Sequence, residues 1–175
     1  GERKTCETHI AVLPFNERFQ GTVGIIRDIT DRKERERELQ MFREAVEQAG
    51  HAVIVTDTDG IITYVNPAFE ESTGYSQAEA IGENPNILNS GEHSREFYAG
   101  LWNTILSGNV WKGEVINERR DGQRYVVEQT IAPIEDKTGT IDRFVAINTD
   151  VTQRKAYQQR LQDYERIIEN LPVGV

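Results

Sequence analysis

The sequence is poor in the residues and segments that build covalent crosslinks and membrane anchors. One cysteine, Cys6, stands among the 175 residues, so an internal disulfide framework is excluded and a reducing compartment is favoured. No apolar run approaches the roughly 20 residues of a membrane-spanning helix, and the start at Gly1 carries no secretory signal. We expect a cytoplasmic location, free in the cytosol or as the cytosolic part of a membrane protein, and no membrane contact by this fragment.

Positive charge is scarce as well. The chain has 20 lysines and arginines against 29 aspartates and glutamates, a formal net charge of −9. This acidic balance argues against nucleic acid and anionic membrane surfaces as partners. Enzyme signatures are also missing: there is no glycine-rich phosphate loop, no nucleophile with a recognisable base, and no Cys/His cluster with metal-ligand spacing. We therefore predict that the fragment is not an enzyme and binds no metal.

An internal repeat is the most informative feature that the chain does have. Asp28-Ile29-Thr30 returns as Asp150-Val151-Thr152, a shift of 122 positions, and the similarity continues without a gap. A repeat of domain size indicates a tandem array of one module. A polar, helical stretch follows each copy, and its apolar residues have the spacing of a coiled-coil seam. The seams are Leu39, Phe42, Val46 and Ala49 in the first copy, and Leu161, Tyr164, Ile168 and Leu171 in the second.

The stretch between the two copies predicts two strands, then small helices, then three strands. Asp59-Gly60 and Asp121-Gly122 are hairpin signals, and Asn66-Pro67 opens a short helix. The segment Gly82–Gly91 is expected to be irregular, and the longest helix is expected over Ser94–Leu106. The predicted strands are Ala52–Thr56, Ile61–Asn66, Val110–Glu118, Gln123–Ile134 and Arg143–Thr149, preceded by a pair at Glu7–Phe15 and Gly21–Ile29.

The order of these elements, with three phrases of the sequence, resembles a PAS sensor domain over about Met41 to Thr152. The phrases are NPAFEESTGYSQAEAIGENPNIL, WKGEVINERRDGQRY and APIEDKTGTIDRFVAINTDVT. The resemblance implies an α+β fold: a five-stranded antiparallel sheet, order 2-1-5-4-3, with small helices on one face, flanked by amphipathic linker helices. It also implies a layout, namely the last strands of a preceding PAS module (1–30), a linker helix (31–50), a complete PAS domain (51–152), an exit helix (153–171) and the start of a following module (172–175).

PAS domains hold ligands between the sheet and the helices, and strand alternation predicts which side chains face that space. Side chains two positions apart share a face of a strand. The inward set is Val115, Asn117, Tyr125, Val127, Gln129, Ile131, Phe144, Ala146 and Asn148. Its three amides must bond to backbone, water or a ligand, because an unpaired buried amide costs about 1–3 kcal/mol. The predicted ligand-contact residues are Trp102, Asn117, Gln129, Asn148, Tyr125, Val127, Phe97 and Leu101; local hydrogen bonds or a solvated cavity are the alternative.

Two cofactor chemistries of the PAS family are not expected. The stretch 82–89 aligns with the reactive motif of light-sensing LOV domains, and there Pro85 replaces the flavin-reactive cysteine and Asn86 replaces a phosphate-pairing arginine. Cysteinyl-flavin photochemistry is therefore excluded. Haem would need an axial histidine in the long helix, whereas His93 and His51 are predicted to be exposed loop residues.

Redox-sensing PAS domains that bind FAD are more similar to this sequence. Leu101-Trp102, Trp111-Lys112-Gly113 and Asn117 stand at matching positions. That resemblance implies that Trp102 packs on the flavin ring and that Asn117 bonds to its polar edge, although Pro85 stands where an acidic flavin partner is found. Three alternatives stay open: FAD, a small aromatic or other metabolite, and a core without a ligand.

The exit from the module is predicted to transfer the signal. A change in the hydrogen bonds of the cavity would shift the strand that leads into the exit helix and re-register that helix in a homodimer. The predicted signal-transfer residues are Asp150, Thr152, Leu161, Tyr164 and Ile168. Expected partners are a small-molecule ligand, a second copy of the chain, and neighbouring PAS and output domains such as a histidine kinase. The alternative function is a ligand-free dimerisation or spacer module, which the seam supports equally well.

Overall fold

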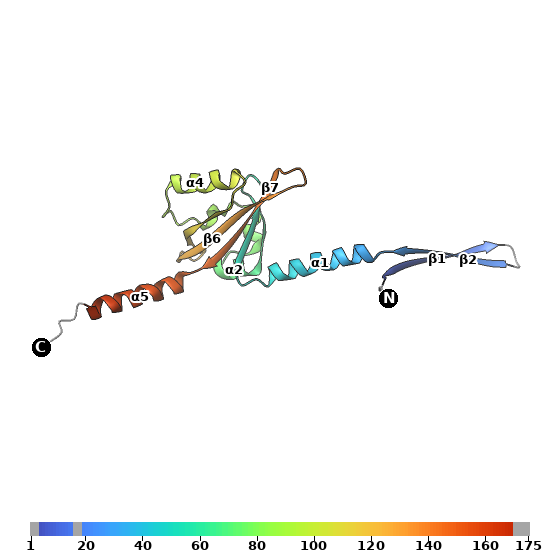
Figure 1. Ribbon diagram of the computed structural model, residues 1–175, viewed down its shortest axis with the longest axis horizontal. Coiled ribbons are helices and arrows are strands. Elements are labelled where there is room, and N and C mark those ends of the chain that lie inside the picture. The colour runs from blue at the N-terminus through green and yellow to red at the C-terminus, as the bar shows by residue number, and fades with distance from the viewer. Residues whose placement is uncertain (1–3, 16–18, 170–175) are drawn as a thin grey trace. The chain divides into compact units, whose positions relative to one another are not determined.

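The computed structural model describes residues 4–15 and 19–169, which fall into two compact units, 1–45 and 46–175. In the first unit, β1 (Cys6–Phe15) pairs antiparallel with β2 (Phe19–Asp28), and α1 (Thr30–Glu47) follows (Figure 1). Both the predicted strand pair and the predicted helix are therefore observed.

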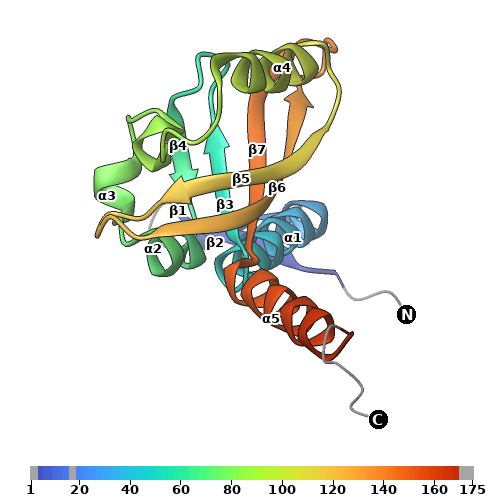
Figure 2. The same ribbon diagram turned by 90° about the vertical axis from the view of Figure 1, so that its left-hand side faces the viewer.

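The second unit is built on a five-stranded antiparallel sheet (Figure 2). β3 (Ala52–Thr56) pairs with β4 (Ile62–Val65) and with β7 (Ile141–Asp150), and β6 (Arg124–Glu135) lies between β7 and β5 (Trp111–Glu118). The order β4-β3-β7-β6-β5 is the predicted order 2-1-5-4-3, because β3 is the first strand of this unit. The predicted α+β fold is confirmed.

Asparagine caps begin two of the helices that connect β4 to β5. Asn66 accepts a hydrogen bond from the Phe69 N–H at 3.2 Å and starts α2 (Pro67–Thr73). Asn84 does the same for the Asn86 N–H at 3.0 Å and starts a 3-10 helix, η1 (Pro85–Leu88). The segment expected to be irregular therefore contains a helical turn. The physical reason is that Asn84-Pro85 repeats the Asn66-Pro67 signal, in which proline fits the first helical position.

Two further helices complete this layer, α3 (Gln77–Ala80) and α4 (Arg95–Leu106). Ser94 caps α4 by accepting the Phe97 N–H at 3.3 Å, so α4 begins where it was predicted to begin. Figure 2 shows α4 lying over one end of the sheet. The buried contact there joins Leu101 and Ile105 of α4 to Ile131 and Phe144 of the sheet.

Burial on the inner face of the sheet concentrates in three clusters. One packs α2, α3 and η1 onto β3 and β4, and it is centred on Phe69, whose side chain is fully buried. The second is the α4 contact, and the third comprises Val115, Tyr125 and Val127 on β5 and β6. Since burial of a large apolar side chain contributes about 1.5–3 kcal/mol, these clusters hold the helices on the sheet and define the space left between them.

Candidate functional site

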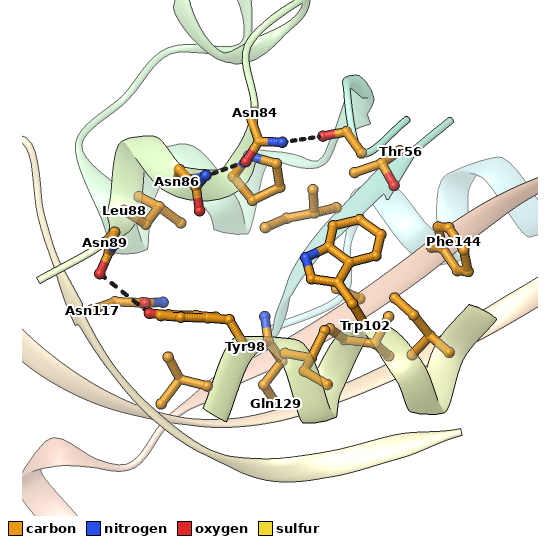
Figure 3. A pocket seen from close by; sticks show the side chains of 18 residues that line it. Thr56, Asn84, Asn86, Leu88, Asn89, Tyr98, Trp102, Asn117, Gln129 and Phe144 are labelled. Atoms are coloured by element: carbon orange, nitrogen blue, oxygen red, sulfur yellow. Dashed lines mark hydrogen bonds between the residues drawn. The ribbon is translucent and has the colours of Figure 1, made fainter. Parts of the chain in front are cut away.

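A cavity of about 110 Å³ lies between the inner face of the sheet, α4 and η1 (Figure 3). Members of all three buried clusters contribute to its wall. Its apolar lining is Ile54, Gly60, Pro85, Leu88, Tyr98, Leu101, Trp102, Ile105, Val115, Ile131, Phe144 and Ala146. Its polar lining is Thr56, Asn84, Asn86, Asn89, Asn117 and Gln129. None of these lining residues carries a formal charge.

The Trp102 indole occupies the centre of this wall. Its ring meets Phe144 edge-on, with ring centroids 5.9 Å apart and an interplanar angle of 85°. On its other side, Trp102 approaches the backbone of Gly60 so closely that a Cβ atom there would lie 2.9 Å from Cη2. Gly60 is buried and adopts a φ of +79°, which a residue with a side chain rarely adopts. The glycine of the Asp59-Gly60 turn is therefore needed both for the turn of the hairpin and for the position of the Trp102 indole in the cavity wall.

Two asparagines of the wall are committed to hydrogen bonds of the protein itself. Asn84 donates its amide to the Gly60 carbonyl at 3.1 Å, and Asn89 accepts from the Tyr98 hydroxyl at 3.2 Å (Figure 3). Gln129 differs from both, because its side chain makes no hydrogen bond within the described part of the chain. Its amide donors and acceptor are therefore free to bind a ligand or water.

Half of the predicted ligand-contact residues line the cavity. Trp102, Leu101, Asn117 and Gln129 do so, whereas Phe97, Tyr125, Val127 and Asn148 lie outside its lining. Tyr125 and Val127 are buried in the third cluster, against which Phe97 packs. Alternation along a strand identifies the inward face, but it does not tell how far along the strand a cavity extends. The other polar lining residues were not predicted, although the Asn84-Pro85 cap signal places η1 at this position. They are Thr56 at the end of β3 and Asn84, Asn86 and Asn89 in and beside η1.

Asn148 is the one buried side chain with an unpaired polar atom in the described residues. Only 5% of Asn148 is exposed, and its Oδ1 has no hydrogen-bond partner. In the ladder of β6 and β7 it stands directly opposite Gln129. Gln129 reaches the cavity, so the orphan oxygen lies one side chain away from it.

His93 corrects an expectation, since it is not an exposed loop residue. Its Nε2 accepts a hydrogen bond from the backbone N–H of Ile116 at 2.9 Å. Its ring stacks on the Phe97 ring, with ring centroids 4.2 Å apart. Ser90 donates its hydroxyl to the Ile116 carbonyl. The loop thus bonds to both backbone groups of Ile116 on β5, which forms one edge of the sheet, and it covers this part of the edge. His51 is exposed, as predicted.

Hydrogen bonds of Asp150 and Thr152 fix the start of α5 (Thr152–Glu169) to the sheet. Asp150 Oδ1 accepts the Thr152 N–H at 2.9 Å, and Thr152 Oγ1 accepts the Val126 N–H of β6 at 2.9 Å. Arg119 pairs with the other oxygen of Asp150 at 2.6 Å. Burial would raise the pKa of Asp150, but the hydrogen bonds from Thr152 and Arg119 together lower it. Asp150 is therefore a charged cap.

Arg119 also connects this junction with the cavity wall. Its guanidinium lies 4.1 Å from the centre of the Tyr125 ring. The Tyr125 hydroxyl is hydrogen-bonded by the side chain of Asn117, which stands opposite it on β5 and lines the cavity. Burial, the largest effect, raises the pKa of Tyr125 to about 12. A continuous set of contacts thus runs from Asn117 through Tyr125 and Arg119 to Asp150.

The first copy of the repeat has the same local geometry. Asp28 accepts the Thr30 N–H at 3.1 Å, and Thr30 Oγ1 accepts the Thr5 N–H of the neighbouring segment at 2.9 Å. Lys4 pairs with Asp28 at 3.0 Å, where Asp150 uses Arg119. Hydrogen bonds from Thr30 lower the pKa of Asp28 to about 2. The sequence repeat is therefore also a repeat of structure.

The predicted seam of α5 is exposed in the single chain. Leu161, Tyr164 and Ile168 are all exposed, whereas Leu171 and the segment 172–175 lie outside the described residues.

No helix in the ranges 4–15 and 19–169 is both long and apolar enough to cross a membrane. In the same ranges, no group of three or more His, Cys, Asp or Glu side chains is placed to hold a metal ion.

The family model for the PAS fold matches residues 40–151, and the chain belongs to this family. It is 37% identical over 139 residues to the nitrogen fixation regulatory protein of Klebsiella pneumoniae, covering 77% of this chain and 28% of that protein. It is 31% identical over 149 residues to the bacterioopsin transcriptional activator of Halobacterium salinarum, and the match covers 83% of this chain and 22% of that protein. The chain thus spans about a quarter of the length of these relatives.

Solved structures agree with the fold. The PAS domain of a protein from Colwellia psychrerythraea superposes with a TM-score of 0.59 at 26% identity, covering 66% of this chain and 98% of that one. An RNA-binding light-oxygen-voltage receptor gives a TM-score of 0.68 at 19% identity, and the match covers 99% of this chain and 46% of that one. The resemblance to PAS domains found in the sequence is confirmed.

Proposed function

We propose that this chain is a sensory module of a multi-PAS signal-transduction protein. Residues 51–152 form the complete PAS domain, 1–30 are the last strands of a preceding PAS module, and 31–50 and 153–171 are linker helices, with a further module beginning at 172. The cavity binds a small molecule, and the change passes through Asp150 and Thr152 to a dimeric exit helix. The observation that carries this proposal is the contact route from Asn117 in the cavity wall to the cap of α5.

The relatives support a role in signal transduction. Besides the nitrogen fixation regulatory protein, they include the aerotaxis receptor of Escherichia coli, at 29% identity over 100 residues, and a blue-light-activated histidine kinase of Erythrobacter litoralis, at 27% over 135 residues. Each is longer than the matched part. An output domain outside this chain, such as a kinase, fits the proposal.

Each step of the route is a contact that a ligand in the cavity can alter. A ligand group that bonds to Asn117 competes with the Asn117–Tyr125 hydrogen bond. The Arg119 guanidinium lies over the Tyr125 ring, and such a cation–π contact contributes about 0.5–2 kcal/mol. Arg119 in turn holds Asp150, whose carboxylate caps α5. A shift of Arg119 therefore changes the first turn of the exit helix, which is the two-state element that coupling requires.

A second connection runs through β6 and β7. Gln129 has free amide groups in the cavity, and Asn148 has an unpaired oxygen opposite it. Gln129 can turn from a ligand toward Asn148 and satisfy that oxygen. Asn148 is two residues before Asp150 on the same strand, so either state of Gln129 is transmitted along β7 to the helix cap.

Ligand retention by the purified 175-residue chain tests the proposal. Native mass spectrometry is expected to show a bound small molecule, or a saturable shift in thermal unfolding on addition of one, and Asn117→Leu is expected to abolish it. Asn103→Leu is the matched control, because Asn103 is exposed on α4 and outside the cavity lining. Retention that survives Asn117→Leu removes Asn117 from the site.

The exposed seam of α5 favours the second candidate, a dimerisation or spacer module without a ligand. Seam residues that are exposed in one chain are suited to a coiled coil with a second chain. This candidate gains support if no molecule binds in any assay while the chain is dimeric. It loses support if a ligand binds and changes the hydrogen exchange of the first turn of α5.

A further inference from the structure

We infer that the cavity is built for an uncharged molecule with a single aromatic ring and an amide-like pair of hydrogen-bonding groups, and that the FAD ring system does not fit it. This inference rests on the proposed function, because it names the class of ligand for the same cavity. Three properties of the wall carry it: volume, absence of charge, and the positions of unused polar groups.

The volume of the cavity sets an upper limit on the size of its ligand. The cavity measures about 110 Å³, whereas an engineered apolar cavity of about 150 Å³ holds benzene and sites for drug-sized ligands are roughly 300–1,000 Å³. The space is therefore at most of the order of one ring. The isoalloxazine system of FAD has three fused rings and exceeds it several-fold when the dinucleotide is included.

Trp102 is the side chain that restricts the volume. Its indole lies so close to the turn at Gly60 that a Cβ atom there would be 2.9 Å from Cη2, so the ring fills the space that the missing side chain leaves. The Phe144 ring lies on another side of the indole, with the two ring centroids 5.9 Å apart. The indole thus occupies the place that a second ring would need, and its face is available to only one ring of a ligand.

Charge is excluded by the lining. Among the lining residues there is no Lys, Arg, Asp, Glu or His. An ionised group loses its hydration on entering such a site and finds no counter-charge, which is far more unfavourable than burial of a neutral polar group. A carboxylate-bearing aromatic is therefore rejected, and so is a phosphate placed inside the cavity.

The unused polar groups define the hydrogen bonds that a ligand has to match. Figure 3 shows the Trp102 indole and the Gln129 amide directed into the cavity. Neither side chain makes a hydrogen bond within the described part of the chain. Trp102 offers one N–H donor, and Gln129 offers both a donor and an acceptor. A ligand with an acceptor and a donor side by side, as in a primary or cyclic amide, satisfies all of them.

Thermal unfolding of the 175-residue chain with four probes tests this inference. The probes are benzamide, benzoate, riboflavin and FAD. Benzamide is expected to raise the Tm in a saturable manner at millimolar concentration, and the other three are expected to leave it unchanged. Benzoate matches benzamide in ring and size, so the comparison isolates charge; riboflavin and FAD isolate size. A shift with benzoate, riboflavin or FAD equal to that with benzamide overturns the inference, and so does no shift with benzamide.

Variants connect the binding to the cavity. Gln129→Leu is expected to weaken benzamide binding about five- to tenfold, the effect of one hydrogen bond. Gln123→Leu, an exposed turn residue outside the lining, is expected to leave it unchanged. Equal affinity in Gln129→Leu overturns the assigned contact. If a flavin co-purifies at a 1:1 ratio, the ligand class is wrong while the sensory function stands; if nothing binds in any arm or in the native mass spectrum, both are wrong.

Discussion

Gln129 and Asn148 stand opposite each other in the register of β6 and β7, and Asn148 Oδ1 is buried with no partner among the described residues. A buried amide oxygen that lacks a donor costs about 1–3 kcal/mol. Asn148 therefore destabilises the fold at a position where an apolar side chain of similar size would not. This unfavourable residue stands two positions before the cap of the exit helix.

Substitution of Asn148 by leucine tests this relationship. Asn148→Leu is expected to leave the free energy of unfolding unchanged or to raise it by about 1 kcal/mol, because the orphan oxygen is removed and apolar volume is kept. Urea denaturation followed by circular dichroism measures the change. If Gln129 and Asn148 transmit the signal, this variant also loses any ligand-dependent change in the first turn of α5.

Asn66 provides the matched control. It is buried to the same degree, but its amide accepts from Val53 and Phe69 and donates to Val46 and His51. Asn66→Leu removes these four hydrogen bonds, and only the Phe69 N–H (to the Asn66 carbonyl, 3.0 Å) and the Val46 carbonyl (from the Ala49 N–H, 3.3 Å) keep a second backbone partner. A loss of at least about 2 kcal/mol is therefore expected. A loss of similar size in Asn148→Leu contradicts the prediction, since Asn148 would then be as well bonded as Asn66.

The close approach of Gly60 to Trp102 leads to a second prediction. Gly60→Ala places a methyl group 2.9 Å from the indole and 3.2 Å from Asn84 Nδ2, on a backbone with φ +79°. Gly122→Ala introduces the same methyl group at φ +85° but into open space. The control Gly122→Ala is expected to lower the free energy of unfolding by about 1–2 kcal/mol through backbone strain alone. Gly60→Ala is expected to lower it by at least about 1 kcal/mol more. Equal losses in the two variants show that the indole moves aside at little cost, and a shift in tryptophan emission is then expected for Gly60→Ala alone.

A third prediction concerns His93 and the edge strand. His93→Phe keeps the stacking on Phe97 but removes the acceptor for the Ile116 N–H, so a loss of about 1 kcal/mol is expected. Hydrogen exchange of the Ile116 amide is expected to become faster. His93→Gln supplies another acceptor and is expected to retain most of the protection. Slow exchange in His93→Phe means that the Ile116 amide has a different partner.

The fold could be predicted from the sequence because its signals are local and agree with each other. Alternating strands, hairpin pairs such as Asp121-Gly122, and the Ser94 cap each fix a short segment, and the segments coincide with β5, β6 and α4. The strand order came from the resemblance to a family, since no local signal determines which strands become neighbours. The helical turn η1 was missed although the Asn84-Pro85 signal was present.

The site was only half predictable, for a physical reason. Alternation assigns a side chain to one face of a strand, and Tyr125 and Val127 do face inward. Whether such a side chain reaches a cavity depends on the helices packed above it, and α4 covers only one end of the sheet. His93 was placed in an exposed loop because the sequence does not indicate that a loop returns to the edge of β5.

A pH dependence follows from the burial of Tyr125, whose pKa is raised from 10.0 to about 12. The unfolded chain releases this proton at lower pH than the folded chain, so the contribution of Tyr125 to stability is complete below pH 10 and is lost as the pH rises toward 12. Between pH 9 and pH 11 the wild type is expected to lose about 1 kcal/mol more stability than Tyr125→Phe. Urea denaturation of both proteins across this range measures the difference. Parallel profiles mean that Tyr125 ionises like an exposed tyrosine.

The last prediction addresses the exit helix as a dimer contact. Leu161 belongs to the exposed seam of α5, together with Tyr164 and Ile168. Leu161→Glu buries a charge without a counter-charge in a seam of two helices, and it is expected to weaken dimerisation at least about tenfold. Gln162→Glu adds the same charge one position further along, outside the seam, and is expected to leave the dimer intact. Sedimentation velocity over a range of concentrations distinguishes the two variants. An unaltered dimer in Leu161→Glu rules out the seam as the contact, and signal transfer would then have to act within a single chain.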